Sequence, residues 1–235
     1  MSLGKKEGIA TIEGLLFDLD GVIIDSRADI TRAVQHTLAL FHQPMLPMDE
    51  IISYVGDGAE ALIRRSFNYA GPDLLAKALP AYLQYYLANP LVETKLYPNV
   101  EATLKKLQRK RPAIKMGLVT NKPEPVSRKI LAGLGVIDCF DQIIGPESVT
   151  RLKPNPDGIF TALRAWDLAP GTVIMIGDSG TDVQAGKSAG TITCGVTYGM
   201  GDKKALIQAR ADFMIDDLAQ LLELVDRYNS FGLDD

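Results

Sequence analysis

The chain has 235 residues, 46% of them hydrophobic and 23% charged, which is enough to bury a core and fits one domain or two small ones. Its formal net charge of -4 argues against a nucleic-acid-binding protein, because such proteins usually carry a basic excess. No apolar run reaches the roughly 18 residues of a membrane span, and residues 1–8 lack the apolar stretch of a signal peptide. We therefore expect a cytoplasmic protein without a membrane partner. Cys139 and Cys194 stand outside any zinc-type or disulfide pattern.

The first predicted element is a strand at Ile12–Leu19, where a short apolar run leads directly into acidic residues and Gly21. Such a run suits a strand that is buried on both faces. From Ser26 to Pro90 the apolar residues recur at helical spacing instead, and no strand pattern interrupts them. We therefore expect a small all-helical unit directly after the first strand.

After Pro98, strand and helix patterns alternate along the chain. Strands are predicted at Ile114–Val119, Gln142–Ile144, Val173–Ile176, Thr193–Val196 and Phe213–Ile215, each with a helix before or after it. This order predicts an α/β fold with a Rossmann-like parallel sheet that has helices on both faces. The catalytic core then comprises residues 1–24 and 97–235. Residues 25–96 form an inserted all-helical cap domain over the carboxyl edge of the sheet, where ligands bind in such folds.

Polar residues follow the ends of three predicted strands. They are Asp18 and Asp20 after the first strand, Thr120, Asn121 and Lys122 after the second, and Asp178 and Asp182 after the fourth. Because the carboxyl ends of parallel strands share one edge of the sheet, these side chains are expected to meet although they are far apart in the sequence. Lys153 precedes a predicted helix and can reach the same edge.

Carboxylates gathered at one point repel one another, and a hard divalent cation removes that conflict. Mg²⁺ takes oxygen ligands, and we expect the side chains of Asp18 and Asp178 and the backbone carbonyl of Asp20 to bind it. The two histidines, His36 and His42, fall in the helical segment, which disfavours zinc at this edge. The predicted cofactor is therefore Mg²⁺.

A carboxylate at such a site can serve as a phosphate-accepting nucleophile. Asp18 is the predicted nucleophile, and Asp20 is the predicted acid and base that protonates the leaving oxygen and later activates water. Phosphoryl transfer also needs groups that balance charge on the phosphate oxygens. The candidates are the Thr120 hydroxyl, the Asn121 amide, the Lys153 ammonium and backbone amides at Gly21. Asp182 is expected to hold Lys153 or a metal-bound water by a hydrogen bond, without binding the metal itself.

These residues form four motifs that resemble those of the haloacid dehalogenase-like hydrolases, in the subgroup with a helical cap after the first motif. The motifs are Phe17–Val22, Val119–Lys122, Leu152–Pro154 and Ile176–Asp182. The resemblance implies an Mg²⁺-dependent phosphomonoester hydrolase that works through an aspartyl-phosphate at Asp18. It also implies that Thr120 and Lys153 hold the phosphoryl group and that Asp178 completes the metal site. The true dehalogenases of the family lack the second aspartate, so Asp20 points to phosphoester chemistry.

Within this subgroup the sequence looks most like the phosphoglycolate phosphatases. Its segment Val55–Arg65 resembles their cap segment. That resemblance implies that Gly56 lies against the substrate and makes Arg65 a candidate partner of a substrate carboxylate. Val22 stands where many of these enzymes carry threonine, so a phosphosugar phosphatase or a β-phosphoglucomutase-like phosphosugar mutase stays an alternative. A non-enzymatic alternative is a phospho-accepting receiver domain, although receiver domains lack an inserted cap. We expect a small phosphorylated substrate and a monomer or homodimer.

Overall fold

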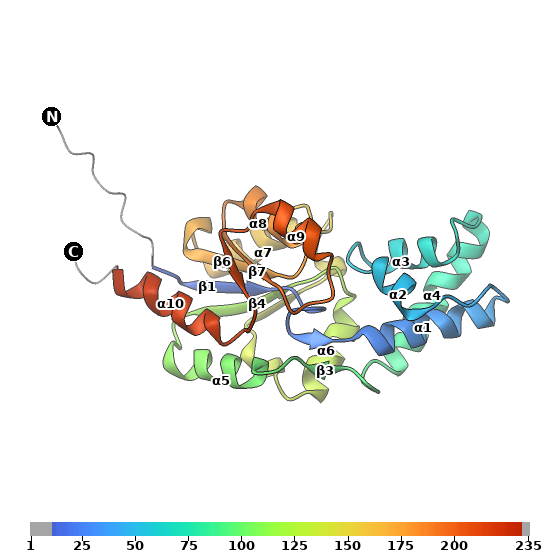
Figure 1. The fold of residues 1–235 in the computed structure, drawn as a ribbon, viewed down its shortest axis with the longest axis horizontal. Helices are drawn as coiled ribbons and strands as arrows, with labels where there is room; N and C mark the ends of the chain where they lie inside the picture. Colours follow the sequence, from blue (N-terminus) through green and yellow to red (C-terminus); the bar gives the residue numbers. More distant parts are fainter. Residues whose placement is uncertain (1–10, 232–235) are drawn as a thin grey trace.

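The computed structural model describes residues 11–231, and its centre is a six-stranded sheet (Figure 1). The strands lie in the order β5-β4-β1-β6-β7-β8, and every neighbouring pair is parallel. Their bounds are Gly14–Phe17 for β1, Lys115–Val119 for β4, Gln142–Ile144 for β5, Val173–Gly177 for β6, Ile192–Val196 for β7 and Phe213–Ile215 for β8. The predicted parallel sheet is confirmed. The outer ends of the predicted core, residues 1–10 and 232–235, lie outside the described residues.

Helices cover both faces of this sheet (Figure 1). One face carries α7 (Asp157–Trp166), α8 (Gly180–Ala189) and α9 (Lys203–Ala209), and the other carries α5 (Val100–Lys110), α6 (Glu124–Gly133) and α10 (Gln220–Phe231). Side chains of β1 alternate between these layers, because successive residues of a strand point to opposite faces. Leu16 packs in the cluster that contains residues of α7 and α8, whereas Leu15 and Phe17 pack in the cluster that contains residues of α5, α6 and α10. Burial on both faces explains the continuous apolar run of β1.

The inserted helices stand beside the end of the sheet to which β1 points (Figure 1). They are α1 (Arg27–Leu40), α2 (Met48–Ser53), α3 (Ala59–Ser66) and α4 (Pro72–Ala88), and α4 packs against both α1 and α3. The chain enters and leaves this unit through β2 (Ile24–Asp25) and β3 (Lys95–Leu96), which pair in antiparallel fashion. The inserted all-helical cap is confirmed. Its exact boundaries at residues 25 and 96 stay a prediction.

The sequence prediction missed the short β2–β3 pair, the exact bounds of the first strand and helix α9. The first strand ends at Phe17 rather than Leu19, because the chain turns there and the Leu19 carbonyl accepts hydrogen bonds from the amides of Ile23 and Ile24. Helix α9 was not predicted, since Leu206 is its one buried residue and leaves no apolar period. Short 3₁₀ turns occur at Ile137–Cys139, Pro146–Ser148 and Pro170–Thr172. Across residues 11–231, no helix is both long enough and apolar enough to cross a bilayer.

Candidate active site

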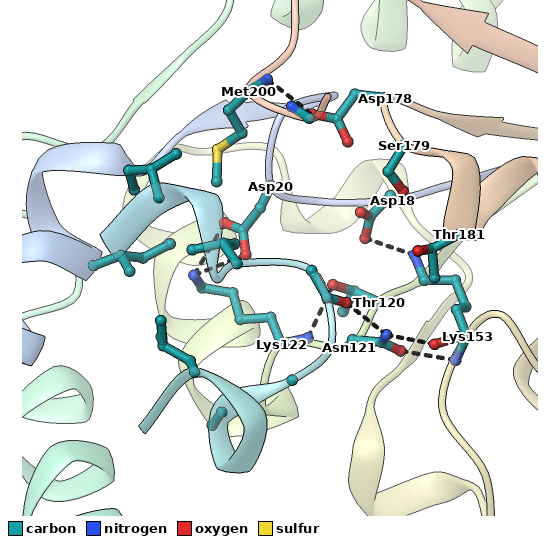
Figure 2. A pocket seen from close by; sticks show the side chains of 18 of the residues that line it. Asp18, Asp20, Thr120, Asn121, Lys122, Lys153, Asp178, Ser179, Thr181 and Met200 are labelled. Carbon is teal, nitrogen blue, oxygen red and sulfur yellow. Dashed lines mark hydrogen bonds and ion pairs between the residues drawn. The ribbon is translucent and has the colours of Figure 1, made fainter. Parts of the chain in front are cut away.

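A cavity lies between the carboxyl edge of the sheet and the cap (Figure 2). The predicted site residues that line it are Asp18, Asp20, Gly56, Thr120, Asn121, Lys153, Asp178 and Asp182. They come from the ends of β1, β4 and β6, from the loop before α7, from the start of α8 and, for Gly56, from the cap. Two predicted residues, Gly21 and Arg65, do not line the cavity. The topology of a parallel sheet thus gathers most of the predicted residues in one place.

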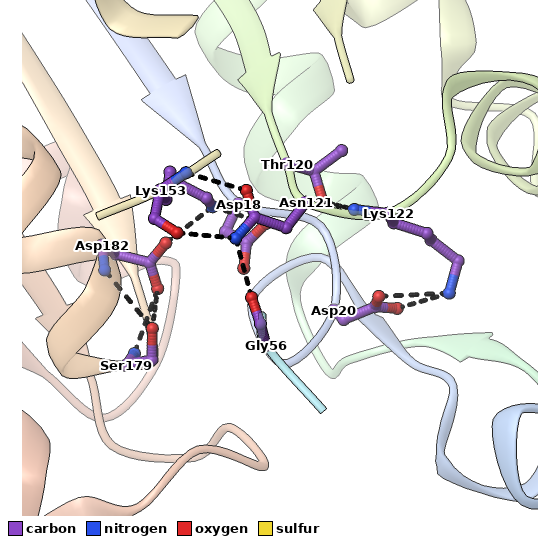
Figure 3. Close-up of polar contacts among 9 residues, drawn as sticks. All are labelled: Asp18, Asp20, Gly56, Thr120, Asn121, Lys122, Lys153, Ser179 and Asp182. Carbon is purple, nitrogen blue, oxygen red and sulfur yellow. Dashed lines mark hydrogen bonds and ion pairs between the residues drawn. The ribbon is translucent and has the colours of Figure 1, made fainter. Parts of the chain in front are cut away.

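Three carboxylates lie close together at the centre of the site, and two of them contact one ammonium group. One oxygen each of Asp18, Asp178 and Asp182 lies within 4.8 Å of the others. Lys153 Nζ lies 2.9 Å from Asp18 Oδ1 and 2.7 Å from Asp182 Oδ1. The other oxygen of Asp182 accepts hydrogen bonds from the amide and the hydroxyl of Ser179 (Figure 3). Asp182 therefore holds Lys153 in place beside Asp18.

Burial and mutual repulsion shift the protonation of this cluster. Burial raises the pKa of Asp18 to about 6, with Lys153 opposing the shift and Asp182 adding to it. Burial also raises the pKa of Asp178 to about 8, and the charges of Asp182 and Asp18 reinforce that effect. Burial alone would lower the pKa of Lys153, but the carboxylates of Asp18 and Asp182 raise it. Lys153 therefore stays charged, and a further cation would lower the energy of the cluster.

The Asp178 carboxylate is held by two backbone amides and fits into space left by Gly21. Asp178 Oδ2 accepts hydrogen bonds of 2.8 Å from the amides of Met200 and Gly201. Gly21 has a φ of +83°, and a Cβ there would lie 1.8 Å from the same oxygen. Gly21 is thus required because only a residue without a side chain leaves room for this carboxylate. The Gly21 amide was predicted to bind the phosphate. In the structure it donates to the Ile24 carbonyl at 2.9 Å, so within this turn it is not available to a phosphate.

This cluster fits Mg²⁺ in its donor chemistry. The gathered side chains offer carboxylate oxygens alone, which is the ligand type that Mg²⁺ prefers. The space that a Cβ at Gly21 would fill is reserved for an oxygen of Asp178. Asp18 and Asp178 are the residues that would hold the ion, because Asp182 is engaged with Lys153 and Ser179.

Asp20 lies apart from this cluster and contacts a lysine that the sequence analysis gave no role. The Asp20 carboxylate accepts hydrogen bonds from Lys122 Nζ at 3.0 and 3.1 Å (Figure 3). It also accepts one from the Ser26 hydroxyl at 2.5 Å. Lys122 Nζ also donates to the Tyr86 hydroxyl of the cap at 2.5 Å. The sequence feature that could have indicated a role for Lys122 is its position directly after Thr120 and Asn121, at the end of a predicted strand.

Asn121 and Thr120 have different environments. Asn121 Nδ2 donates to the carbonyls of Gly56 and Lys153 at 2.8 and 3.0 Å, and its Oδ1 accepts from the Lys153 amide at 3.0 Å. Its two amide hydrogens are therefore used on backbone groups, so in this geometry Asn121 connects the cap loop to the Lys153 loop and has no donor left for a phosphate. The Thr120 hydroxyl accepts from the Lys122 amide at 3.2 Å, and its own hydrogen can still serve a phosphate.

Arg65 on α3 is not brought to the cavity. Its guanidinium forms an ion pair with Asp57 and donates to the Tyr54 carbonyl at 3.2 Å. The cationic side chains that do line the cavity are Lys122 and Lys153, and both belong to the predicted core. The cap contributes an apolar wall, made of Ile30, Ile52, Val55, Ala59 and Leu62 together with Tyr82 and Tyr86.

Comparison with known proteins gives the family. The model of the haloacid dehalogenase-like hydrolase family matches residues 15–196, which hold all four motifs. The chain belongs to the haloacid dehalogenase-like hydrolases. This hydrolase is 31% identical over 218 residues to a phosphoglycolate phosphatase of Pasteurella multocida, across 89% of the chain and 96% of the relative. It is 34% identical over 223 residues to a phosphoglycolate phosphatase of Neisseria meningitidis, across 92% of the chain and 94% of the relative.

A solved structure agrees with this family assignment. The hydrolase superimposes with a TM-score of 0.86 on a predicted phosphoglycolate phosphatase from Haemophilus somnus 129PT, at 27% identity, covering 92% of this chain and 99% of that one. Family and relatives together confirm the predicted enzyme class, a phosphatase.

Proposed function

We propose that this enzyme is an Mg²⁺-dependent phosphomonoester hydrolase that works through an aspartyl-phosphate on Asp18. The supporting observation is that Asp18 stands in a cavity beside Asp178 and 2.9 Å from the ammonium of Lys153. A carboxylate with a raised pKa next to a fixed cation is typical of a reactive site rather than of a surface ion pair. The resemblance to phosphoglycolate phosphatases agrees with this chemistry.

In the first step an Asp18 oxygen attacks phosphorus and the ester bond to the leaving group breaks. Asp20 gives a proton to the leaving oxygen, while Lys153 and the Thr120 hydroxyl balance charge on the phosphate oxygens. Burial raises the pKa of Asp18 to about 6 in the metal-free site, and a bound cation beside it would favour the charged carboxylate that attacks. Bound Mg²⁺ would supply charge compensation between the nucleophile and the phosphate.

In the second step water attacks phosphorus and releases phosphate from Asp18. Asp20, now unprotonated, takes a proton from this water, so one residue serves as acid and then as base. Asp182 keeps Lys153 at its position through both steps by the 2.7 Å contact. The carboxylate of Asp18 is regenerated, and the cycle needs no further reactant than water.

We propose 2-phosphoglycolate as the first substrate to test, because the relatives are named phosphoglycolate phosphatases. The cap side of the cavity is apolar and brings no lysine or arginine to it. A mutase or a bisphosphate phosphatase needs a cation for a second phosphate, so this wall disfavours those two alternatives. The cap itself, proposed to span residues 25–96, would close over the leaving group and exclude water.

The test is a Mg²⁺-dependent assay of phosphate release from a panel of small phosphoesters. We expect hydrolysis that a chelator abolishes and that Asp18→Asn removes. Asp57→Asn is the matched control, because Asp57 is an exposed aspartate of the cap that pairs with Arg65 outside the cavity. Turnover that survives in Asp18→Asn would refute the proposed role of Asp18.

A further inference from the structure

The carboxylate of Asp20 is held by a buried lysine rather than by the metal cluster. The Lys122 side chain is 3% exposed, and its ammonium contacts both oxygens of Asp20. We propose that Lys122 is a positioning residue that aims Asp20 and that Tyr86 of the cap fixes Lys122 in that place. This inference rests on the proposed function, since it assigns a partner to the acid and base of that reaction.

The contacts of Lys122 leave its ammonium little freedom. A lysine ammonium has three hydrogens, and here the acceptors are the two oxygens of Asp20 and the hydroxyl of Tyr86. Lys122 Nζ also lies 4.5 Å from the centroid of the Tyr86 ring, within the range of a cation–π contact. Burial raises the pKa of Tyr86, so this hydroxyl stays neutral and accepts a hydrogen bond from Lys122 without adding a second charge beside it.

Tyr86 makes this arrangement depend on the cap. Tyr86 lies in the last turn of α4 and is 1% exposed, so its position is fixed by the cap. Lys122 follows β4 in the core, and Asp20 follows β1 (Figure 2). One ammonium therefore joins a cap side chain to the proton-transfer group of the core. When the cap moves away, Lys122 loses the Tyr86 hydroxyl as a partner and holds Asp20 less rigidly.

The lysine does not act as a simple structural ion pair if this inference holds. Proton donation by Asp20 matters most when the leaving group is poor. A misplaced Asp20 carboxylate should therefore lower the rate more for a poor leaving group than for a good one. A misplacement of about 1 Å at a reacting group lowers the rate by roughly 10²-fold. Phenyl phosphate and 4-nitrophenyl phosphate offer rings of similar size with a poor and a good leaving group.

The experiment measures kcat and KM of Lys122→Met and Tyr86→Phe on both aryl phosphates with Mg²⁺. We expect kcat/KM for phenyl phosphate to fall about 100-fold in Lys122→Met, with roughly a tenfold or smaller loss for 4-nitrophenyl phosphate. Tyr86→Phe should change the same ratio in the same direction by less. Lys129→Met is the matched control, because Lys129 also contacts the cap, at the Leu87 carbonyl, but not Asp20.

Several outcomes overturn the inference. Equal losses on both substrates, or the same change in Lys129→Met, would show that Lys122 only docks the cap. A rise in KM with kcat unchanged would instead make Lys122 a substrate-binding residue. A crystal structure of Lys122→Met gives a readout without activity: an Asp20 carboxylate that has turned away supports the inference, and an unmoved one overturns it. Wild-type protein that hydrolyses no phosphoester would refute the proposed function, while this crystal structure would still decide the role of Lys122.

Discussion

Replacing Gly21 with alanine separates the cost of backbone strain from the cost of displacing Asp178. Gly21 has a φ of +83°, and an alanine in this left-handed region costs roughly 1–2 kcal/mol. The new Cβ would also lie 1.8 Å from Asp178 Oδ2, whereas real contacts of this kind stay above 3.0 Å. To reach even that limit, the carboxylate must move by 1.2 Å and leave the amides of Met200 and Gly201.

The matched control is Gly135→Ala. Gly135 has a φ of +70°, and a Cβ there meets nothing within 4 Å. Both variants should therefore lose about 1–2 kcal/mol of unfolding free energy from strain, measured by urea titration. Gly21→Ala should in addition lose roughly 10²-fold in kcat/KM and bind Mg²⁺ more weakly, because a ligand of the proposed metal site has moved. Gly135→Ala should keep full activity.

This prediction is refuted if Gly21→Ala matches Gly135→Ala in both activity and Mg²⁺ binding. That result would mean that Asp178 needs no fixed position or that the turn yields without moving it. A crystal structure of Gly21→Ala would separate these two explanations.

Three further predictions concern the segment of residues 92–94 that leads out of the cap, the metal and the cap itself. Asp29→Ala should lower the unfolding free energy by about 3 kcal/mol in urea titration, because Asp29 Oδ2 accepts from the backbone amides of residues 92–94 and from the Thr94 hydroxyl. Burial acts to raise the pKa of Asp29, but these hydrogen bonds outweigh it, and the net pKa is lowered. The stabilisation from Asp29 is therefore complete above the unfolded pKa of about 4 and is lost as the pH falls through the folded pKa. Because the pKa of Asp178 is about 8, Mg²⁺ binding should release about one proton at pH 7 and almost none at pH 10, measured by calorimetry in buffers of different ionisation enthalpy. Arg65→Met should change KM for 2-phosphoglycolate by less than about twofold in a steady-state assay, since Arg65 pairs with Asp57 outside the cavity.

Each of these has a contradicting result. Wild-type stability in Asp29→Ala would show that the amides of residues 92–94 find water instead. Proton release that does not change between pH 7 and pH 10 would mean that Asp178 is not the titrating ligand. A tenfold rise in KM for Arg65→Met would place its guanidinium on the substrate after all.

The sheet was predictable because a strand buried on both faces has a continuous apolar sequence, as in β1, β4 and β6. The end of β1 was not, since Leu19 is apolar and fully buried although it lies in the turn. Helix α9 was not predicted because its single buried side chain, Leu206, gives no helical period of apolar residues. Local pattern thus predicts elements whose burial is regular and misses those whose burial is not.

The meeting of Asp18, Thr120 and Asp178 followed from topology, because all three come after neighbouring parallel strands. The contacts of Lys122 could not be predicted in this way. Lys122 is 102 residues from Asp20 and 36 from Tyr86, and no spacing rule links a core loop to a side chain in the cap. The same holds for the hydrogen bond from Asn121 to Gly56, which spans 65 residues and depends on where the cap lies.

In the proposed reaction Asp18 itself accepts the phosphoryl group. The most direct measurement is mass spectrometry of peptides from enzyme that is mixed with substrate and Mg²⁺ and quenched rapidly in acid, with Asp20→Asn used to slow the second step. We expect a phosphoryl adduct on the peptide that contains Asp18, absent without Mg²⁺ and absent in Asp18→Asn. Turnover of the same substrate without any adduct on that peptide, or with the adduct on another residue, would contradict that expectation.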